Sequence, residues 1–330
     1  MICQSSFDCL NPRDSNSFLF FDSYDHLINL RDFKKIIGIS YMANYMLHYM
    51  NQTGEHQRNN LRIDEEGKVT LHIEESGSSR SPRALGWFYL PIGHNDPDLN
   101  KIGKLIRENS LVGGKIFSTP LVFGRRIKIF NINVDGKETT HILNARAPMP
   151  AQFISLEQEI INLIKRLEKA PLRTFAMDIF LEPSKIKPGD YIQITFKFRN
   201  AGKFSTEFRN PATFTTGAHS SLLINLWRQV KRENGSLIDE YETAFDLSGC
   251  EFLTDEHRAI NSTEPFLRIP PGEVLCTWTK FRFPKAETGT HIAEPIYYGG
   301  PMTQDEEEKR HDLLVGRYQA DLKNITVVKN

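Results

Sequence analysis

The stretch Tyr191-Ile-Gln-Ile-Thr-Phe-Lys-Phe198 decides the fold, because apolar and polar residues alternate along it without a break. Strict alternation over so few residues is typical of a β-strand that buries one face and exposes the other. Turn-forming residues bound the stretch, with Lys187-Pro-Gly-Asp190 before it and Asn200-Ala-Gly202 after it. Such residues interrupt regular structure, so the pattern predicts a short strand that is half buried in a sheet.

Segments of the same kind recur through the second half of the chain. Alternating or β-rich runs, separated by turn residues, occupy residues 175–181, 222–230, 237–241, 266–269, 275–283, 289–293 and 317–328. About seven short strands at such spacing are typical of two antiparallel sheets packed face to face. We therefore expect an all-β sandwich over residues 174–330.

The turn residues of this region also carry a resemblance to a known fold family. Their order is Lys187-Pro-Gly-Asp190, a strand, Asn200-Ala-Gly202, then Pro271-Gly-Glu273, a strand, Phe283-Pro284 and Gly289-Thr290. This layout resembles the bacterial immunoglobulin-like (Ig-like) modules. The resemblance implies an Ig-like β-sandwich and no particular activity, because that fold serves many functions. The region is longer than the roughly hundred residues of such a module, and the excess falls in residues 201–221, 246–265 and 294–312.

Residues 1–150 mix helical and β patterns. From Asp25 to Met50 apolar residues recur at steps of three and four, which predicts a helix. A second, short helix is expected over residues 98–108, and strands over 61–63, 69–73, 85–90, 126–134 and 138–143. Asp135-Gly136 suits the positive φ angles of a type I′ turn, so it predicts a β-hairpin between the last two strands. The region is predicted to be an α+β domain with an antiparallel sheet.

A helix is expected to join the two regions. Residues 155–169 place Leu156, Ile160 and Leu163 on one apolar stripe, with Ser155 as the N-cap and Pro171 beyond the end. The fold class predicted for the chain is therefore an α+β N-terminal domain (residues 1–150), a linking helix (residues 151–173) and an all-β Ig-like sandwich (residues 174–330).

The composition excludes some classes of function. The 41 Lys and Arg residues balance 41 Asp and Glu residues, which gives a formal net charge of zero. A general nucleic-acid binder or a protein attracted to anionic membranes would carry a basic excess, so neither partner is expected. The N-terminal sequence has no secretory signal pattern, and the most apolar stretch, residues 33–50, contains Lys34 and Lys35. We expect no membrane insertion and a cytoplasmic location.

No residue pattern indicates catalysis, a metal site or a cofactor. Asp96-Pro-Asp98 begins like a calcium loop, but Lys101 and Arg107 stand where the loop needs Gly and Glu. The 10 histidines form no His-x-His or His-Glu-x-x-His pair, and the 4 cysteines form no Cys-x-x-Cys pair. Cys250 and Cys276 lie in the same region and are either free thiols or a pair; we expect free thiols.

The candidate binding residues lie in three segments. The long loop 201–220 places aromatic rings among polar residues, an arrangement suited to a binding loop. The alternative is that these rings only cover the open end of the sandwich. A tyrosine stripe in the N-terminal helix and an acidic run around residue 305 are further candidates. The residues concerned are Phe204, Phe208, Arg209, Phe214, His219, Tyr41, Tyr45, Asp305 and Glu306.

These features favour a non-enzymatic protein whose partner is another protein. By analogy with cytoplasmic bacterial proteins of this build, we expect an inhibitor or immunity-type protein that covers the active site of a toxin or effector. The acidic run would then suit a basic partner. Two alternatives stand beside this hypothesis. One is a hydrolase whose site lies in an interdomain cleft and uses His94 or His219, and the other is a structural or secretion-associated adaptor.

Overall fold

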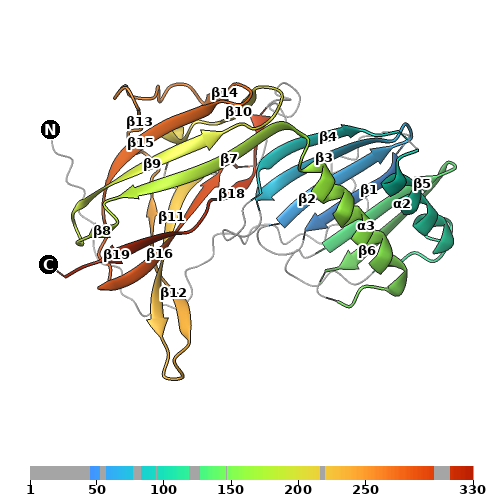
Figure 1. Ribbon diagram of the computed structural model, residues 1–330, viewed down its shortest axis with the longest axis horizontal. Coiled ribbons are helices and arrows are strands. Elements are labelled where there is room, and N and C mark those ends of the chain that lie inside the picture. Colours follow the sequence, from blue (N-terminus) through green and yellow to red (C-terminus); the bar gives the residue numbers. More distant parts are fainter. Residues whose placement is uncertain are drawn as a thin grey trace. The chain divides into compact units, whose positions relative to one another are not determined.

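The structure is a computed structural model of the chain. It describes residues 45–52, 57–76, 83–93, 95–118, 127–145, 147–215, 220–300 and 313–329. More than half of these residues are in β-strands, almost all paired antiparallel, and two α-helices accompany them (Figure 1). Residues Asn44–Asn330 group into one compact unit. The described chain is therefore mostly β, as expected.

The N-terminal strands form an antiparallel sheet in the order β6-β5-β1-β2-β3-β4. The strands are β1 (Tyr45–Gln52), β2 (Gln57–Asp64), β3 (Lys68–Ser76), β4 (Leu85–Pro91), β5 (Ile127–Val134) and β6 (Lys137–Asn144). Asp135 and Gly136 have φ angles of 53° and 75°, which confirms the predicted hairpin between β5 and β6.

The predicted helix over residues 25–50 is wrong at its C-terminal end, and residues 25–44 lie outside the described residues. Residues 46–50 read Met-Leu-His-Tyr-Met, an almost continuous apolar run that fits either a helix or a buried strand. Pairing with β2 on one side and β5 on the other makes this segment a strand. Leu47 and Tyr49 point into the core, and both are fully buried.

Helices α2 (Pro97–Glu108) and α3 (Ala151–Leu167) cover one face of this sheet (Figure 1). The Asp96 side chain caps α2 by accepting a hydrogen bond from the backbone N–H of Asp98. Arg166 near the end of α3 contacts the carboxylates of both Asp96 and Asp98, which ties the two helices together. The predicted linking helix is present, but it begins at Ala151 after Pro150 rather than at the predicted cap Ser155.

Strand β7 (Pro171–Glu182) follows α3 and pairs with two strands. Its first residues pair with β4, and its later residues pair with β9 (Tyr191–Arg199). A hydrogen-bonded strand therefore runs from the N-terminal sheet into the C-terminal region. The predicted division of the chain between residues 150 and 174 stays a prediction.

The C-terminal region consists of two larger arrays, antiparallel except for the parallel pair of β19 and β8, and a small sheet. Strands β15 (Val274–Arg282) and β13 (Leu253–Thr254) continue the array of β7 and β9. The second array contains β12 (Leu237–Asp246), β11 (Ser221–Lys231), β16 (Gly289–Tyr298), β18 (Arg317–Gln319), β19 (Lys323–Val327) and β8 (Lys185–Ile186). The small sheet holds β14 (Phe266–Ile269), β10 (Thr206–Arg209) and β17 (Leu313–Leu314), with the 3₁₀-helix η1 (Pro211–Thr213) after β10.

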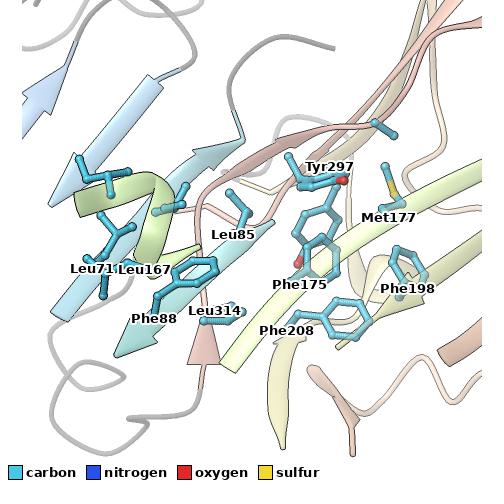
Figure 2. Close-up of a cluster of buried hydrophobic side chains, with 14 of the residues drawn as sticks. Leu71, Leu85, Phe88, Leu167, Phe175, Met177, Phe198, Phe208, Tyr297 and Leu314 are labelled. Carbon is cyan, nitrogen blue, oxygen red and sulfur yellow. The ribbon is translucent and has the colours of Figure 1, made fainter. Parts of the chain in front are cut away.

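Aromatic side chains fill the core between the two arrays (Figure 2). The Phe175 ring of β7 lies 4.8 Å from the Tyr297 ring of β16, and the Phe245 ring of β12 lies 5.4 Å from the Phe281 ring of β15. The alternation that predicted β9 is confirmed, because its four apolar side chains are fully buried: Ile192, Ile194, Phe196 and Phe198. Burying a side chain of this size contributes about 1.5–3 kcal/mol.

Candidate functional site on an exposed sheet face

The structure separates the aromatic residues predicted for the binding loop. The Phe204 side chain is 51% exposed, and the Arg173 guanidinium lies 5.3 Å from its ring. Phe208 and Phe214 are buried instead, because β10 and the residues after it turn these rings toward Phe175 and Tyr297. These two rings are part of the core, which agrees with the alternative that the loop covers the end of the sandwich.

The other predicted binding residues do not gather at one place among the described residues. The Arg209 guanidinium lies 5.7 Å from the Phe266 ring, and the Arg209 carbonyl accepts a hydrogen bond from the Tyr297 hydroxyl. Tyr45 begins β1, opposite Asp64 of β2. The remaining predicted residues lie outside the described residues: Tyr41, His94, His219, Asp305 and Glu306.

A different surface brings aromatic and charged residues together. On β7, β9 and β15 the residues between the buried ones point away from the core. We call the surface that they form, with Lys323 beside it, the cationic aromatic face. Besides Ala176, Val274 and Cys276 at one end, its residues are Asp178, Phe180, Glu182, Tyr191, Gln193, Thr195, Lys197, Arg199, Trp278, Lys280, Arg282 and Lys323.

The strand register aligns these side chains in rows across the three strands. Thr195 of β9 stands between Phe180 of β7 and Trp278 of β15. One row further along, Gln193 lies between Glu182 and Lys280. Side chains in such opposed positions are about 4.5–5.5 Å apart at Cβ, so each row presents one continuous contact surface.

Lysine side chains surround the aromatic rings of this face. The Lys197 ammonium lies 4.7 Å from the centre of the Phe180 ring, and the Lys323 ammonium lies 5.8 Å from it. The Lys280 ammonium lies 6.0 Å from the Trp278 ring. Cation–π contacts of this kind at exposed positions contribute about 0.5–1 kcal/mol each. They hold the ammonium groups over the rings and keep the charges at the surface.

The rings of the face differ in how firmly they are held. The indole N–H of Trp278 donates to the Thr254 carbonyl at 3.1 Å, and the His257 ring packs edge-on at 5.4 Å. Phe180 and Tyr191 are 44% and 67% exposed. The Trp278 ring is therefore held in one orientation, whereas the Tyr191 side chain presents most of its surface to solvent.

An open depression of about 410 Å³ lies at one end of the face. It is lined by Glu182, Tyr191, Gln193 and Lys280, so an ammonium, an amide, a carboxylate and a phenol ring meet there. Sites that enclose small ligands bury most of the ligand surface. An open depression with polar walls is better suited to a side chain that projects from a larger partner.

The charge of the face is positive. It carries five cationic side chains, Lys197, Arg199, Lys280, Arg282 and Lys323, against the two carboxylates Asp178 and Glu182. Asp178 is itself paired with Arg199 at 3.1 Å. The face thus has an excess of positive charge although the chain as a whole is neutral. Such a local field attracts an acidic surface.

The structure also places a histidine beside a carboxylate, away from this face. The His291 Nε2 lies 2.5 Å from Glu242 Oε2, and its Nδ1 lies 3.2 Å from the Gly289 carbonyl. The His291 side chain is fully buried, and both ring nitrogens are occupied by these contacts. This pair therefore fastens β12 to β16 and offers no nitrogen to a substrate.

Several further observations bear on the sequence predictions. Among the described residues no group of His, Cys, Asp and Glu is placed to hold a metal ion. Cys250 and Cys276 are free thiols, as expected. Burial raises the pKa of the Cys276 thiol, and the charge of Asp255 adds to this effect. None of the described helices has the length and hydropathy needed to cross a membrane.

The cationic aromatic face was missed at the sequence level for a specific reason. Alternation in residues 191–198 and 275–283 assigns Tyr191, Lys197 and Lys280 to the solvent side of their strands. It does not reveal that β9 lies between β7 and β15, because strand order is set by long-range pairing. The signal that could have found the face is the placement of Phe180 and Trp278 at outward positions where polar residues are usual.

Comparison with known proteins identifies no family for this chain. No family model matches it, and no curated protein matches its sequence. Among solved structures, Spo0M, a sporulation control protein from Bacillus subtilis, is 16% identical over 46% of this chain and 49% of its own, with a TM-score of 0.25. The CARDB domain of the PF1109 protein from Pyrococcus furiosus is 13% identical over 48% of this chain and 90% of its own, with a TM-score of 0.22. The match thus spans about half of Spo0M, and the likeness to both structures is partial.

Proposed function

We propose that this chain is a non-enzymatic protein-binding protein that contacts an acidic partner protein through the cationic aromatic face. The observation that carries the proposal is the row arrangement of Phe180, Trp278 and Tyr191 among lysines and arginines on one exposed sheet face. Trp, Tyr and Arg are the residue types most enriched among the side chains that carry the binding energy of protein interfaces, and lysines around them steer an acidic partner. The depression beside Tyr191 gives one side chain of the partner a place to insert.

The character of the face favours a macromolecule over a small ligand. Its residues spread over three adjacent strands, and the depression is open to solvent. The two carboxylates Asp178 and Glu182 within the face would repel a uniform polyanion. A partner protein with acidic groups opposite the lysines, and neutral or basic groups opposite Glu182, satisfies the whole pattern.

The biological role that we propose is that of an inhibitor or immunity-type protein that occludes a toxin or effector. A firmly held Trp278 and a rigid sheet limit the conformational entropy lost on binding, which suits a tight inhibitor. We further propose that residues 174–330 form an Ig-like sandwich, on the basis of the turn residues and of the two arrays that face each other. The function itself rests on the face and not on the fold.

Capture of a partner from a lysate of the source organism tests the proposal. The lysate is treated with nuclease, and the immobilised baits are the natural chain, a Lys197→Glu/Lys280→Glu variant and a Tyr191→Ala variant. A Lys104→Glu/Lys137→Glu variant, changed at two exposed lysines outside the face, serves as the matched control for net charge. We expect one stoichiometric partner on the natural chain and on the control, and about tenfold less on the two face variants.

Thermal unfolding of every bait accompanies the capture. Because Tyr191 is 67% exposed, it contributes little to stability. The free energy of unfolding of Tyr191→Ala should therefore lie within about 0.5 kcal/mol of that of the natural chain. Equal capture by all four baits would refute the proposed face. The capture is repeated with a lysate that is not treated with nuclease, and a species captured only from that untreated lysate would refute a protein partner.

A further inference from the structure

The depression at the end of the cationic aromatic face contains a carboxylate without a counter-ion. Of the two carboxylates of the face, Asp178 is paired with Arg199 at 3.1 Å. Glu182 is exposed and lines the depression, and among the described residues no ammonium or guanidinium forms an ion pair with it. The one negative charge of the face that is not already compensated therefore lies in the depression.

The cations on neighbouring strands are held by other groups. Lys280 stands in the same row as Glu182, but β9 lies between them, so two strand spacings of about 4.8 Å separate their backbones. The Lys280 ammonium lies 6.0 Å from the centre of the Trp278 ring. The Arg282 guanidinium donates from Nε to the Gly189 carbonyl at 3.1 Å. Glu182 is therefore left for a cation that comes from outside the chain.

A partner protein that covers the face has to supply this cation. Contact with the partner removes water from the Glu182 carboxylate, and a charge that loses its water without gaining a counter-ion is strongly unfavourable. The side chains beside Glu182 favour arginine among the possible cations. Tyr191 presents a ring that is 67% exposed, and Gln193 presents a side-chain amide. A guanidinium stacks on such a ring and donates several hydrogen bonds in one plane, whereas an ammonium is a compact, strongly hydrated charge.

We propose that the depression binds an arginine side chain of the acidic partner protein, with the guanidinium stacked on Tyr191 and paired with Glu182. The Gln193 amide oxygen would accept a further hydrogen bond. This inference rests on the proposed function, because it names one residue of the same partner. The partner surface then carries an arginine among the acidic residues that lie opposite the lysines. An acidic surface without this arginine is rejected, because it leaves Glu182 without a counter-ion.

Two blocked pentapeptides distinguish an arginine site from general attraction by charge. The probes are Glu-Ala-Arg-Ala-Glu and the same peptide with citrulline, which has nearly the shape of arginine without its charge. Attraction by a positive face alone would favour the citrulline peptide, because that peptide is the more negative one. We expect the arginine peptide to bind about fivefold more tightly, as one ion pair and one cation–π contact at an open site allow. Binding is followed by NMR shifts of the full chain.

Variants of the chain assign the preference to the depression. Glu182→Gln should bind the two peptides within about twofold of each other, because the counter-ion of the guanidinium is gone. Tyr191→Ala should reduce the preference for arginine about twofold, because the stacking surface is lost. Glu65→Gln removes an exposed carboxylate in the turn between β2 and β3, outside the face, and is the matched control that keeps the full preference.

The outcomes separate this inference from the proposed function. Equal or tighter binding of the citrulline peptide, a preference for arginine that survives in Glu182→Gln, or no shift at the depression with either peptide would overturn the inference. A peptide with lysine in place of arginine that binds as tightly would overturn the choice of arginine. If Lys197→Glu/Lys280→Glu still loses the captured partner while the peptides show no preference, the inference alone fails and the proposed face stands.

Discussion

His48 is a buried histidine whose protonation opposes folding. Its Nε2 donates to Asn60 Oδ1 at 2.7 Å. Burial lowers the pKa of His48 from 6.5 to about 4, and the charge of Arg62 contributes in the same direction. His48 therefore binds a proton more weakly in the folded chain than in the unfolded chain. The stability associated with neutral His48 is fully present above pH 6.5 and is lost as the pH falls toward 4.

Urea unfolding at two pH values checks this expectation. Between about pH 7 and about pH 4.5 the natural chain should lose up to about 3 kcal/mol more stability than His48→Gln, whose amide keeps the bond to Asn60 and does not titrate. An equal loss in both chains would show that His48 is not the group concerned.

Glu157 joins helix α3 to the sheet through two buried contacts. It accepts a hydrogen bond from the Tyr49 hydroxyl at 2.5 Å and pairs with the Lys128 ammonium at 2.8 Å. Removing the charge leaves a poorly hydrated ammonium without its counter-ion, so Glu157→Gln should lower the free energy of unfolding by about 3 kcal/mol. Glu159→Gln on the same helix is the control. The partner of Glu159 is Lys101, which is 60% exposed. Losing this ion pair should lower the free energy of unfolding by less than about 1 kcal/mol. Equal destabilisation in thermal unfolding would contradict this view of Glu157.

For single residues, the sequence predicts well whether a side chain points into the core or toward solvent, provided that the hydrophobic pattern is local. The outward and inward sides of residues 191–198 follow from alternation alone. Phe208 and Phe214 show where this fails, because polar neighbours made their segment resemble a loop. Phe208 is buried where β10 pairs with β14 and β17, and Phe214 packs against Tyr297 of β16, all of which lie far away in sequence. The burial of such residues therefore cannot be read from their local sequence.

The junction of β4 and β7 depends on a single glycine. Gly86 has a φ angle of 124°, and a Cβ atom built on it would lie 2.1 Å from the Arg173 carbonyl oxygen. Gly86→Ala therefore forces the two strands apart and should destabilise the chain by about 2–4 kcal/mol. Gly93→Ala is the control, because a Cβ there meets nothing within 4 Å. Thermal unfolding distinguishes the two, and a Gly86→Ala chain as stable as the control would contradict the pairing of β4 with β7.

At the element scale the accuracy of prediction follows the range of the interactions involved. The Asp135-Gly136 hairpin and helix α2 are specified by residues within a few positions of each other, and both were predicted. Strand β1 was predicted as a helix, because only its neighbours β2 and β5 distinguish the two structures. The single strand expected over residues 317–328 is divided into β18 and β19, which pair with different parts of β16.

At the scale of the whole molecule the neutral net charge conceals a separation of charge. The cationic aromatic face carries an excess of positive side chains, and β12 carries an excess of negative ones. The balanced composition argued against a general polyanion binder, and it offered no means of seeing this separation before the strand order was known.

The salt dependence of binding follows from this separation. Raising the ionic strength from about 0.05 M to about 0.5 M should lower the affinity of the partner for the cationic aromatic face about tenfold, because exposed charges are screened over shorter distances. The Lys197→Glu/Lys280→Glu variant should show a smaller dependence than the natural chain. An affinity independent of salt would exclude an acidic partner.

Lysine footprinting of the purified complex tests the central claim most directly. Each lysine is acetylated with a limiting reagent in the free chain and in the complex with its captured partner, and the extent of modification is measured by mass spectrometry. We expect Lys197, Lys280 and Lys323 to become protected, while Lys104 and Lys137 react equally in both states. Unchanged reactivity at the first three lysines in a stoichiometric complex would contradict the assignment of the cationic aromatic face as the binding surface.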